Sequence, residues 1–283
     1  MRKQNIIKKT KGLVLTLACV FLLAACGSDN AGDTGSSGDQ GQLPVINVTT
    51  EAETQDPSKK ELTFAEIEKL AATAVFNVKW YTTEGDYSAG TSYLIDSEKY
   101  GGKLLVTAFH YLWPDNAQTF TGEELPGYVK GGELYYAQSG EDTGARLKCN
   151  LVIPDADAVP NIAKDVAAFA IKNGDSLPTL KLSTRKPAPG EKIYLLARLW
   201  DGEVINENCV YEAEVVSCGN DEIVYTIDKK YGSTMGASGG PLVDKYGEVV
   251  GMHMAGNEAY YFGHVTESFA VQIDGGHLSD VTY

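Results

Sequence analysis

The chain has 283 residues, with 24 basic and 38 acidic side chains and a formal net charge of −14. This acidity argues against nucleic acid as a partner, because a polyphosphate backbone is bound by basic surfaces. Past the N-terminal region the sequence shows no internal repeat and no second segment that would span a membrane.

The first 25 residues predict a lipoprotein signal peptide. Five basic residues come first, and they are Arg2, Lys3, Lys8, Lys9 and Lys11. The apolar run from Leu13 to Ala25 is too short to span a bilayer comfortably. Leu23-Ala24-Ala25-Cys26 then resembles the bacterial lipobox, in which the cysteine is acylated, with palmitate among its lipids, and becomes the first mature residue. An ordinary cleaved signal peptide is the alternative.

Residues 26–61 predict a lipidated Cys26 followed by a disordered tether. Residues 27–42 are rich in Gly, Ser, Asp and Gln and have almost no apolar side chains. Removal of residues 1–25, which hold five basic residues and no acidic one, leaves 19 basic against 38 acidic side chains, a formal charge of −19. We expect a membrane-anchored lipoprotein on the extracytoplasmic side of a bacterial cell envelope.

Cysteine use in the globular part is sparse. Cys149, Cys209 and Cys218 remain there, and an exported location permits a disulfide. Cys209 and Cys218 could close a short loop, with buried free thiols as the alternative. No Cys/His spacing indicates zinc, so we expect no metal and no cofactor.

Thr63 and Glu66 have the spacing of a capping box and predict a helix to about Thr73. The period then changes to two, since Phe76 and Val78 alternate with polar neighbours. Further strands are expected at 88–96, 103–107, 133–138, 146–153, 166–171, 192–200, 210–217, 222–227 and 248–254. Many short strands with almost no helix predict an all-β fold, a sandwich or a pair of barrels, and about 200 residues suffice for two packed barrels.

Three segments carry the side chains of a nucleophilic site. Ser238 lies in Gly236-Ala237-Ser238-Gly239-Gly240-Pro241, where glycines allow a sharp turn that exposes the hydroxyl and nearby amides. His110 ends the apolar segment that begins at Leu104, and Asp165 begins another. A serine hydroxyl becomes a nucleophile when a base and an orienting acid accompany it. The order His110, Asp165, Ser238 is that of the chymotrypsin-type triad.

The same segments resemble those of trypsin-like serine proteases. The segment 105–110 (LVTAFH) is similar to the family's L-T-A-A-H, 165–167 (DVA) to its D-I-A, and 236–243 (GASGGPLV) to its G-[DN]-S-G-G-P-L-V. On these motifs the chain is identified as a member of the trypsin-like (chymotrypsin-fold) family over roughly residues 74–275.

The resemblance implies a serine endopeptidase with catalytic residues His110, Asp165 and Ser238. It also implies two packed six-stranded Greek-key barrels, the first at about 74–160 and the second at about 178–275, within a protease domain of residues 62–283. The active site would lie in the cleft between the barrels.

The resemblance assigns further residues. The amides of Gly236 and Ser238 would form the oxyanion hole, and a polypeptide substrate would add as a strand against Met254-Ala255-Gly256. Ala237 replaces the Asp that pairs with a newly cut N-terminus in the animal enzymes, so activation by that route is not expected. Tyr111 follows His110, so the disulfide beside the catalytic histidine of those enzymes cannot form.

For substrate specificity, Gly232 stands where the family places the Asp that selects Arg or Lys. Gly251-Met252-His253 is similar to the Gly-x-His of the glutamyl endopeptidase branch, in which the imidazole donates to the substrate side chain. Ser233 and Thr234 could add hydroxyl donors. We therefore expect cleavage after Glu, Asp or Gln; alternatively, His253 is a satisfied buried histidine.

Two other classes of protein compete with this interpretation. An α/β-hydrolase esterase also uses Gly-x-Ser-x-Gly, but its acid and base follow the serine, and only 45 residues follow Ser238. A catalytically silent, protease-fold binding module at the cell surface stays open, because a fold does not guarantee chemistry.

Overall fold

The computed structural model describes residues 59–112, 121–152, 164–199, 209–228, 234–257 and 259–282. The expected signal peptide, Cys26 and the tether up to residue 58 lie outside these residues, as do Gly232 and Ser233. Within the described ranges, no helix is both long and apolar enough to cross a membrane.

The first barrel consists of six antiparallel strands. They are β1 (Val75–Thr82), β2 (Gly85–Ser97), β3 (Gly102–Thr107), β4 (Val129–Tyr136), β5 (Asp142–Val152) and β6 (Ala167–Lys172). Their order around the barrel is β1-β2-β3-β6-β5-β4, and β6 closes it by pairing with both β3 and β5. This barrel therefore extends beyond the expected limit of residue 160, because β6 belongs to it.

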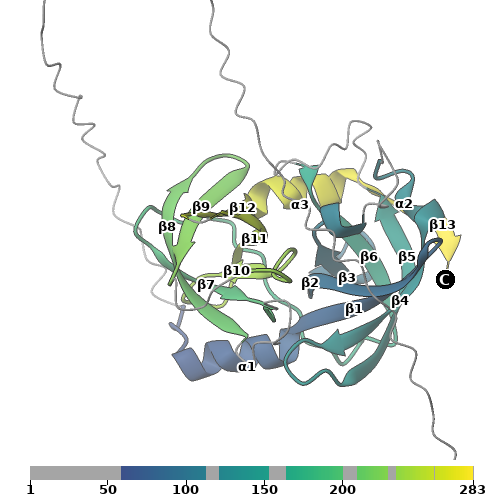
Figure 1. Cartoon of the computed structure of the whole chain (residues 1–283), viewed down its shortest axis with the longest axis horizontal. Coiled ribbons are helices and arrows are strands. Elements are labelled where there is room, and N and C mark those ends of the chain that lie inside the picture. The colour runs from purple at the N-terminus through teal and green to yellow at the C-terminus, as the bar shows by residue number, and fades with distance from the viewer. Residues whose placement is uncertain are drawn as a thin grey trace, which may run out of the picture. The chain divides into compact units, whose positions relative to one another are not determined.

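The second barrel also closes with six strands. They are β7 (Lys192–Leu196), β8 (Val210–Cys218), β9 (Glu222–Ile227), β10 (Pro241–Val243), β11 (Val249–Gly256) and β12 (Tyr261–Val265). The order β7-β8-β9-β12-β11-β10 repeats the order of the first barrel strand for strand. Figure 1 shows the second barrel on the left and the first on the right. The predicted all-β fold of two six-stranded barrels is confirmed.

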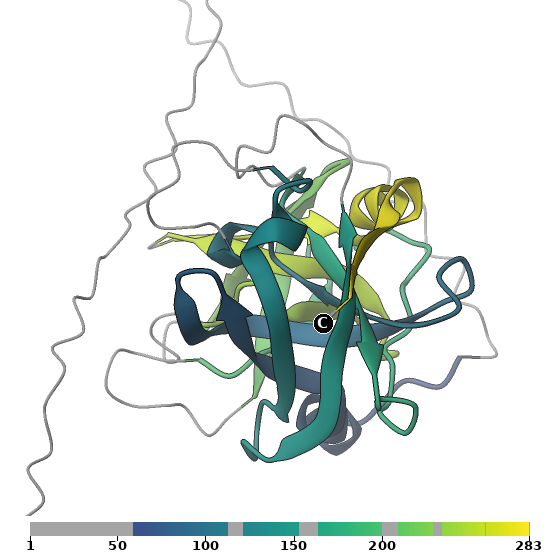
Figure 2. The ribbon, with the colours of Figure 1, turned by 90° about the vertical axis from the view of Figure 1, so that its right-hand side faces the viewer.

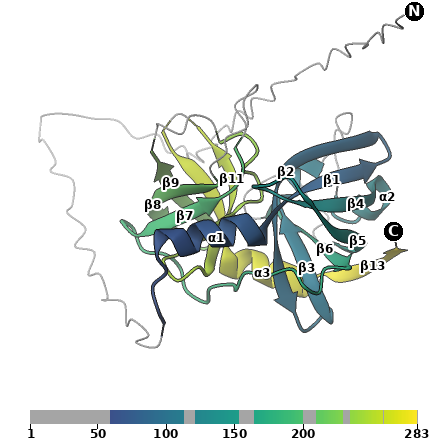
Figure 3. The same cartoon turned by 90° about the horizontal axis from the view of Figure 1, so that it is seen from below.

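Helix α1 (Phe64–Ala74) begins at the predicted capping box. The Thr63 hydroxyl accepts from the Glu66 amide (3.3 Å), and the Glu66 carboxylate accepts from the Thr63 amide (2.8 Å). The buried residues Ile67, Ala71 and Ala74 recur at helical spacing, so one face of α1 packs on the protein. Figure 3 shows α1 lying along the second barrel and leading directly into β1 of the first.

The C-terminal part returns to the first barrel. Helix α3 (Thr266–Gly275) follows β12, and β13 (His277–Thr282) then pairs with β5 as a seventh strand of the first sheet (Figure 2). The expected elements include neither, because Val265 provides no side-chain cap and the apolar residues of β13, Leu278 and Val281, do not alternate. Two single turns, η1 (His110–Leu112) and α2 (Leu125–Tyr128), complete the elements.

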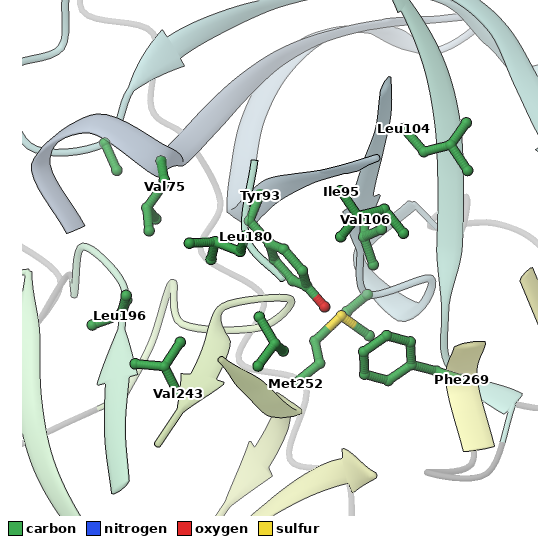
Figure 4. Packing of buried hydrophobic residues seen from close by; sticks show 14 of the residues in the cluster. Val75, Tyr93, Ile95, Leu104, Val106, Leu180, Leu196, Val243, Met252 and Phe269 are labelled. Carbon is green, nitrogen blue, oxygen red and sulfur yellow. The ribbon is translucent and has the colours of Figure 1, made fainter. Parts of the chain in front are cut away.

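A continuous apolar cluster joins the two barrels. Tyr93 and Val106 of the first barrel pack in it with Val243 and Met252 of the second, and all four are fully buried. Figure 4 shows these side chains converging, with Phe269 of α3 at the edge. Each fully buried side chain of this size stabilises the fold by about 1.5–3 kcal/mol. The cluster therefore fixes the position of one barrel relative to the other.

Two cysteines are described with their side chains. Cys209 is buried and Cys218 is half-buried, and both are free thiols. The structure therefore has the second of the two alternatives that the sequence leaves open, free thiols in place of a disulfide. Burial raises the pKa of Cys209 to about 11, so its thiol stays protonated at neutral pH.

Candidate active site

His110 begins η1, shortly after the end of β3, a strand whose apolar residues are buried in the first barrel. The chain turns immediately after Phe109 into η1, which is closed by the Leu112 amide donating to the Phe109 carbonyl (2.9 Å). This turn projects the imidazole out of the sheet, and the His110 side chain remains 29% exposed. The ring is therefore accessible from solvent.

Asp165 precedes β6 and is buried. One carboxylate oxygen accepts from the His110 amide (2.7 Å), and the other lies 2.6 Å from His110 Nδ1. With both oxygens bound to one residue, the carboxylate orients the imidazole and favours the tautomer that carries hydrogen on Nδ1. The other ring nitrogen, Nε2, lies 3.0 Å from Ser238 Oγ. The structure thus brings the three predicted residues into one hydrogen-bonded chain.

The loop that carries Ser238 is built from glycines with left-handed backbone. Gly236 has φ 90° and Gly239 has φ 83°, values that side-chain-bearing residues rarely adopt. At Gly239 a Cβ would lie 2.3 Å from the Thr91 carbonyl oxygen and 2.8 Å from the Ala108 amide. Glycine is therefore required here so that the second barrel can approach the backbone of the first.

The amides of this loop fall into two groups. The Ala237 amide donates to the Thr234 carbonyl (2.9 Å), that of Gly239 to the His253 carbonyl (2.8 Å), and that of Gly240 to the Ala237 carbonyl (2.7 Å). The remaining two of the segment 236–240, those of Gly236 and Ser238, donate to no residue in the described part of the chain. Two unpaired amides beside a serine hydroxyl form a site that can bind a developing negative oxygen.

The electrostatics of the site favour a proton acceptor at His110. Burial pushes the pKa of His110 down, but the charge of Asp165 and its hydrogen bond outweigh burial and raise the pKa above its ordinary value. The imidazolium that would form after proton transfer is therefore stabilised where it is needed.

His253, on β11, is almost completely buried and hydrogen-bonds through Nδ1 to the Tyr225 hydroxyl. Burial, together with the nearby His110, lowers the pKa of His253 to about 3, so its ring is neutral at physiological pH. The rings of Tyr225, His253 and Tyr261 form a triangle with centroid separations of 5.8–6.3 Å. The hydroxyl of Thr234 lies beside Gly256 at the end of β11, where a Cβ would be 3.3 Å from the hydroxyl oxygen.

The segment Met254–Gly256 lies at the end of β11. It pairs with β12 on one side, whereas β10 on the other side pairs with β11 only as far as Met252. The Ser238 hydroxyl lies 3.4 Å from the Met254 carbonyl. The strand edge beside Ser238 is thus free of any strand in the described residues.

Two residues near the site are given no role in it by the sequence pattern. Thr91, in β2, contacts the Ser238 loop, and Tyr111 hydrogen-bonds through its hydroxyl to that of Thr107. The Tyr111 ring lies against Gly90, where a Cβ would be 2.2 Å from Cε1. Tyr111 is noted in the sequence only because it excludes a disulfide beside His110, and Thr91 has the pattern of an ordinary strand residue.

Comparison with known proteins agrees with this architecture. Two antiparallel six-stranded barrels with identical strand order define a chymotrypsin-like fold. The family model described as a trypsin-like peptidase domain matches residues 90–252, more than half of the chain. The chain therefore belongs to the trypsin-like peptidase family. A search of curated proteins found no sequence match.

Solved structures resemble this chain in fold. A Glu endopeptidase aligns with TM-score 0.55 and 15% identity over 77% of this chain and 95% of its own. A serine endoprotease from Yersinia pestis aligns with TM-score 0.51 and 17% identity over 77% and 67%. The active form of the Rv3671c protease from M. tuberculosis aligns with TM-score 0.51 and 14% identity over 75% and 84%. At such identities the likeness concerns the fold alone.

Proposed function

We propose that the protein is a serine endopeptidase whose catalytic residues are His110, Asp165 and Ser238. The observation that carries the proposal is the continuous hydrogen-bonded chain from Asp165 through both nitrogens of His110 to Ser238 Oγ, with separations of 2.6 and 3.0 Å. Such an arrangement, next to unpaired amides, is what acyl transfer from a peptide bond requires.

In the proposed mechanism, His110 Nε2 takes the proton of the Ser238 hydroxyl as Oγ attacks the peptide carbonyl. The amides of Gly236 and Ser238 bind the oxyanion, a contribution of about 3 kcal/mol per donor in comparable sites. His110 then gives its proton to the leaving amine, which leaves an acyl-enzyme on Ser238. Water, deprotonated by His110, hydrolyses this ester and restores the hydroxyl.

The substrate binds in this proposal as an added strand along Met254–Gly256. The free edge of β11 and its closeness to Ser238 support this, because backbone hydrogen bonds along an edge hold a peptide in register irrespective of its sequence. The scissile carbonyl then faces the unpaired amides.

For specificity we propose a preference for Glu, Asp or Gln on the acyl side of the cut bond. Tyr225 is fully buried, and His253 is the described partner of its hydroxyl, so the phenol donates its proton to Nδ1. The neutral imidazole then carries hydrogen on Nε2, which has no hydrogen-bond partner among the described residues. This donor and the hydroxyl of Thr234 suit an oxygen-bearing side chain, and we propose from the sequence alone that Ser233, which lies outside the described residues, adds another hydroxyl.

The specificity is tested with peptides that differ only in the residue before the cut bond. We expect faster cleavage after Glu, Asp or Gln, and selective loss of that advantage in His253→Ala. Equal rates for all residues, or faster cleavage after large apolar ones, would refute the pocket role while leaving the endopeptidase assignment intact.

We also propose that Cys26 is acylated and anchors the protein to the outer face of a bacterial membrane, on the sequence pattern alone. Wild-type protein is expected to partition with membranes, and Cys26→Ser to lose the lipid and be released or stay unprocessed. An unmodified Cys26 in the mature protein, detected by mass spectrometry, would rule this out.

The endopeptidase assignment is tested with Ser238→Ala and an active-site acylating probe. The wild type should hydrolyse peptides and carry the probe on Ser238, whereas the variant should do neither, yet unfold at the same denaturant concentration because no core group is removed. A wild-type protein that binds peptides without cutting them or reacting with the probe would instead be a silent binding module.

A further inference from the structure

A threonine of the first barrel forms two hydrogen bonds with the serine loop of the second, residues 236–240. Thr91, in β2, is fully buried. Its amide donates to the Ser238 carbonyl (2.7 Å), and its hydroxyl donates to the Gly236 carbonyl (2.7 Å). One residue thus binds the backbone on both sides of Ala237, across the interface between the barrels.

Thr91 is itself fixed by a hydrogen bond from the neighbouring strand. The hydroxyl of Thr107, on the neighbouring strand β3, donates to the Thr91 carbonyl (2.8 Å), and Thr107 is also fully buried. Gly239 packs against the same carbonyl at a distance that leaves no room for a side chain. Thr91 is therefore a fixed support, not a mobile surface contact.

The two bonds constrain the peptides on either side of the one that carries the unpaired Ser238 amide. A carbonyl held at Gly236 fixes the plane of the 236–237 peptide, and one held at Ser238 fixes the plane of the 238–239 peptide. The 237–238 peptide, which carries the Ser238 amide, lies between these fixed planes. The side chain of Ala237 has no polar group, and the residue is fully buried.

We propose that Thr91 is a positioning residue whose hydroxyl keeps the Ser238 amide directed at the oxyanion. The inference rests on the proposed endopeptidase function and adds a residue that touches neither substrate nor nucleophile side chain. Loss of the hydroxyl leaves the Gly236 carbonyl without its donor, and the 236–237 peptide is then held only through the Ala237 amide and its bond to the Thr234 carbonyl.

The test is Thr91→Val, which keeps the shape and the backbone amide but removes the hydroxyl. We expect kcat to fall by about 10- to 100-fold with KM unchanged, a loss bounded by removal of one complete oxyanion donor. Thr91→Ser restores the donor and should recover most of the rate. If Thr91→Val does not fold, Thr91→Ala compared with Thr91→Ser makes the same measurement.

Thr266→Val is the matched control. Thr266 is also a buried threonine whose hydroxyl donates to a backbone carbonyl, that of Val249 (2.8 Å), but it lies in α3 away from the serine loop. It should lose similar stability and keep full activity. A structural role for Thr91 would make the two valine variants equivalent.

The decisive readout is a peptide boronic acid, which forms a tetrahedral adduct with the serine, measured against the corresponding product peptide. In Thr91→Val the boronate affinity should fall in parallel with kcat while product binding stays constant. Activity equal to that of Thr266→Val, a rise in KM alone, or no rescue by Thr91→Ser overturns the positioning role. An inactive, boronate-insensitive wild type would instead overturn the endopeptidase proposal.

Discussion

Asp165→Asn is the sharpest test of how the site orients His110. Because the His110 amide donates to Oδ1 of Asp165, the asparagine amide would be held with its oxygen at that position. Its NH₂ group would then replace Oδ2 and face Nδ1 at the present 2.6 Å contact. Two donors cannot share a hydrogen bond, so Nδ1 must become the acceptor and Nε2 must carry the hydrogen.

The wrong tautomer removes the base, because a protonated Nε2 cannot accept from Ser238. In the chymotrypsin-type example this substitution costs about 10⁴ in kcat, equivalent to about 5.5 kcal/mol of transition-state stabilisation. The loss of the carboxylate also removes the charge that raises the pKa of His110, and burial alone then lowers that pKa.

The assay is kcat as a function of pH on a peptide substrate, with thermal unfolding to show that the variant is folded. We expect a loss of about four decades at neutral pH and an acid limb that moves to lower pH than in the wild type. A folded Asp165→Asn that keeps more than a tenth of the wild-type kcat would refute the proposed role of Asp165.

Two further predictions follow from the same geometry. In the wild type, kcat/KM should rise with pH through a pKa above the ordinary value for histidine, because only neutral His110 accepts a proton; a limb centred below that value would contradict the raised pKa. Gly239→Ala should lower the free energy of unfolding by about 2–4 kcal/mol, from a left-handed backbone and overlap with the Thr91 carbonyl. Gly190→Ala, with φ 82° and open space around it, isolates the backbone part, so equal losses in the two variants would exclude the overlap.

Local patterns explain why much of the fold is predictable. The capping box at Thr63 and Glu66 and the alternation in β1 are signals within a few residues, and both elements form as expected. The sequence pattern does not predict β12 and β13, because their residues alternate weakly and their positions depend on pairing with distant strands, β9 and β5. The repeated strand order of the barrels leaves no trace as a sequence repeat.

The site likewise has residues that local sequence predicts and contacts that it does not. His110 and Ser238 stand in segments whose composition alone indicates a strand end and a glycine turn, and the structure brings them together. The hydroxyl contact of Thr91 and the partner of His253 depend on the docking of separate barrels and on strand neighbours, which no local pattern encodes.

Because the site is divided between two barrels, the rate of hydrolysis depends on how the barrels are docked. His110 follows β3 and Asp165 precedes β6 of one barrel, whereas Ser238 precedes β10 of the other. The 3.0 Å contact between His110 and Ser238 therefore depends on the apolar cluster around Tyr93 and Met252 that joins the barrels. If the barrels separate at this cluster by a fraction of an ångström, each barrel keeps its own strand hydrogen bonds. Proton transfer between His110 and Ser238, however, does not tolerate such a shift. Turnover should therefore cease in denaturant before circular dichroism records any loss of strand. A solvent or a bound partner that disturbs the interface between the barrels would likewise abolish activity without unfolding the protein.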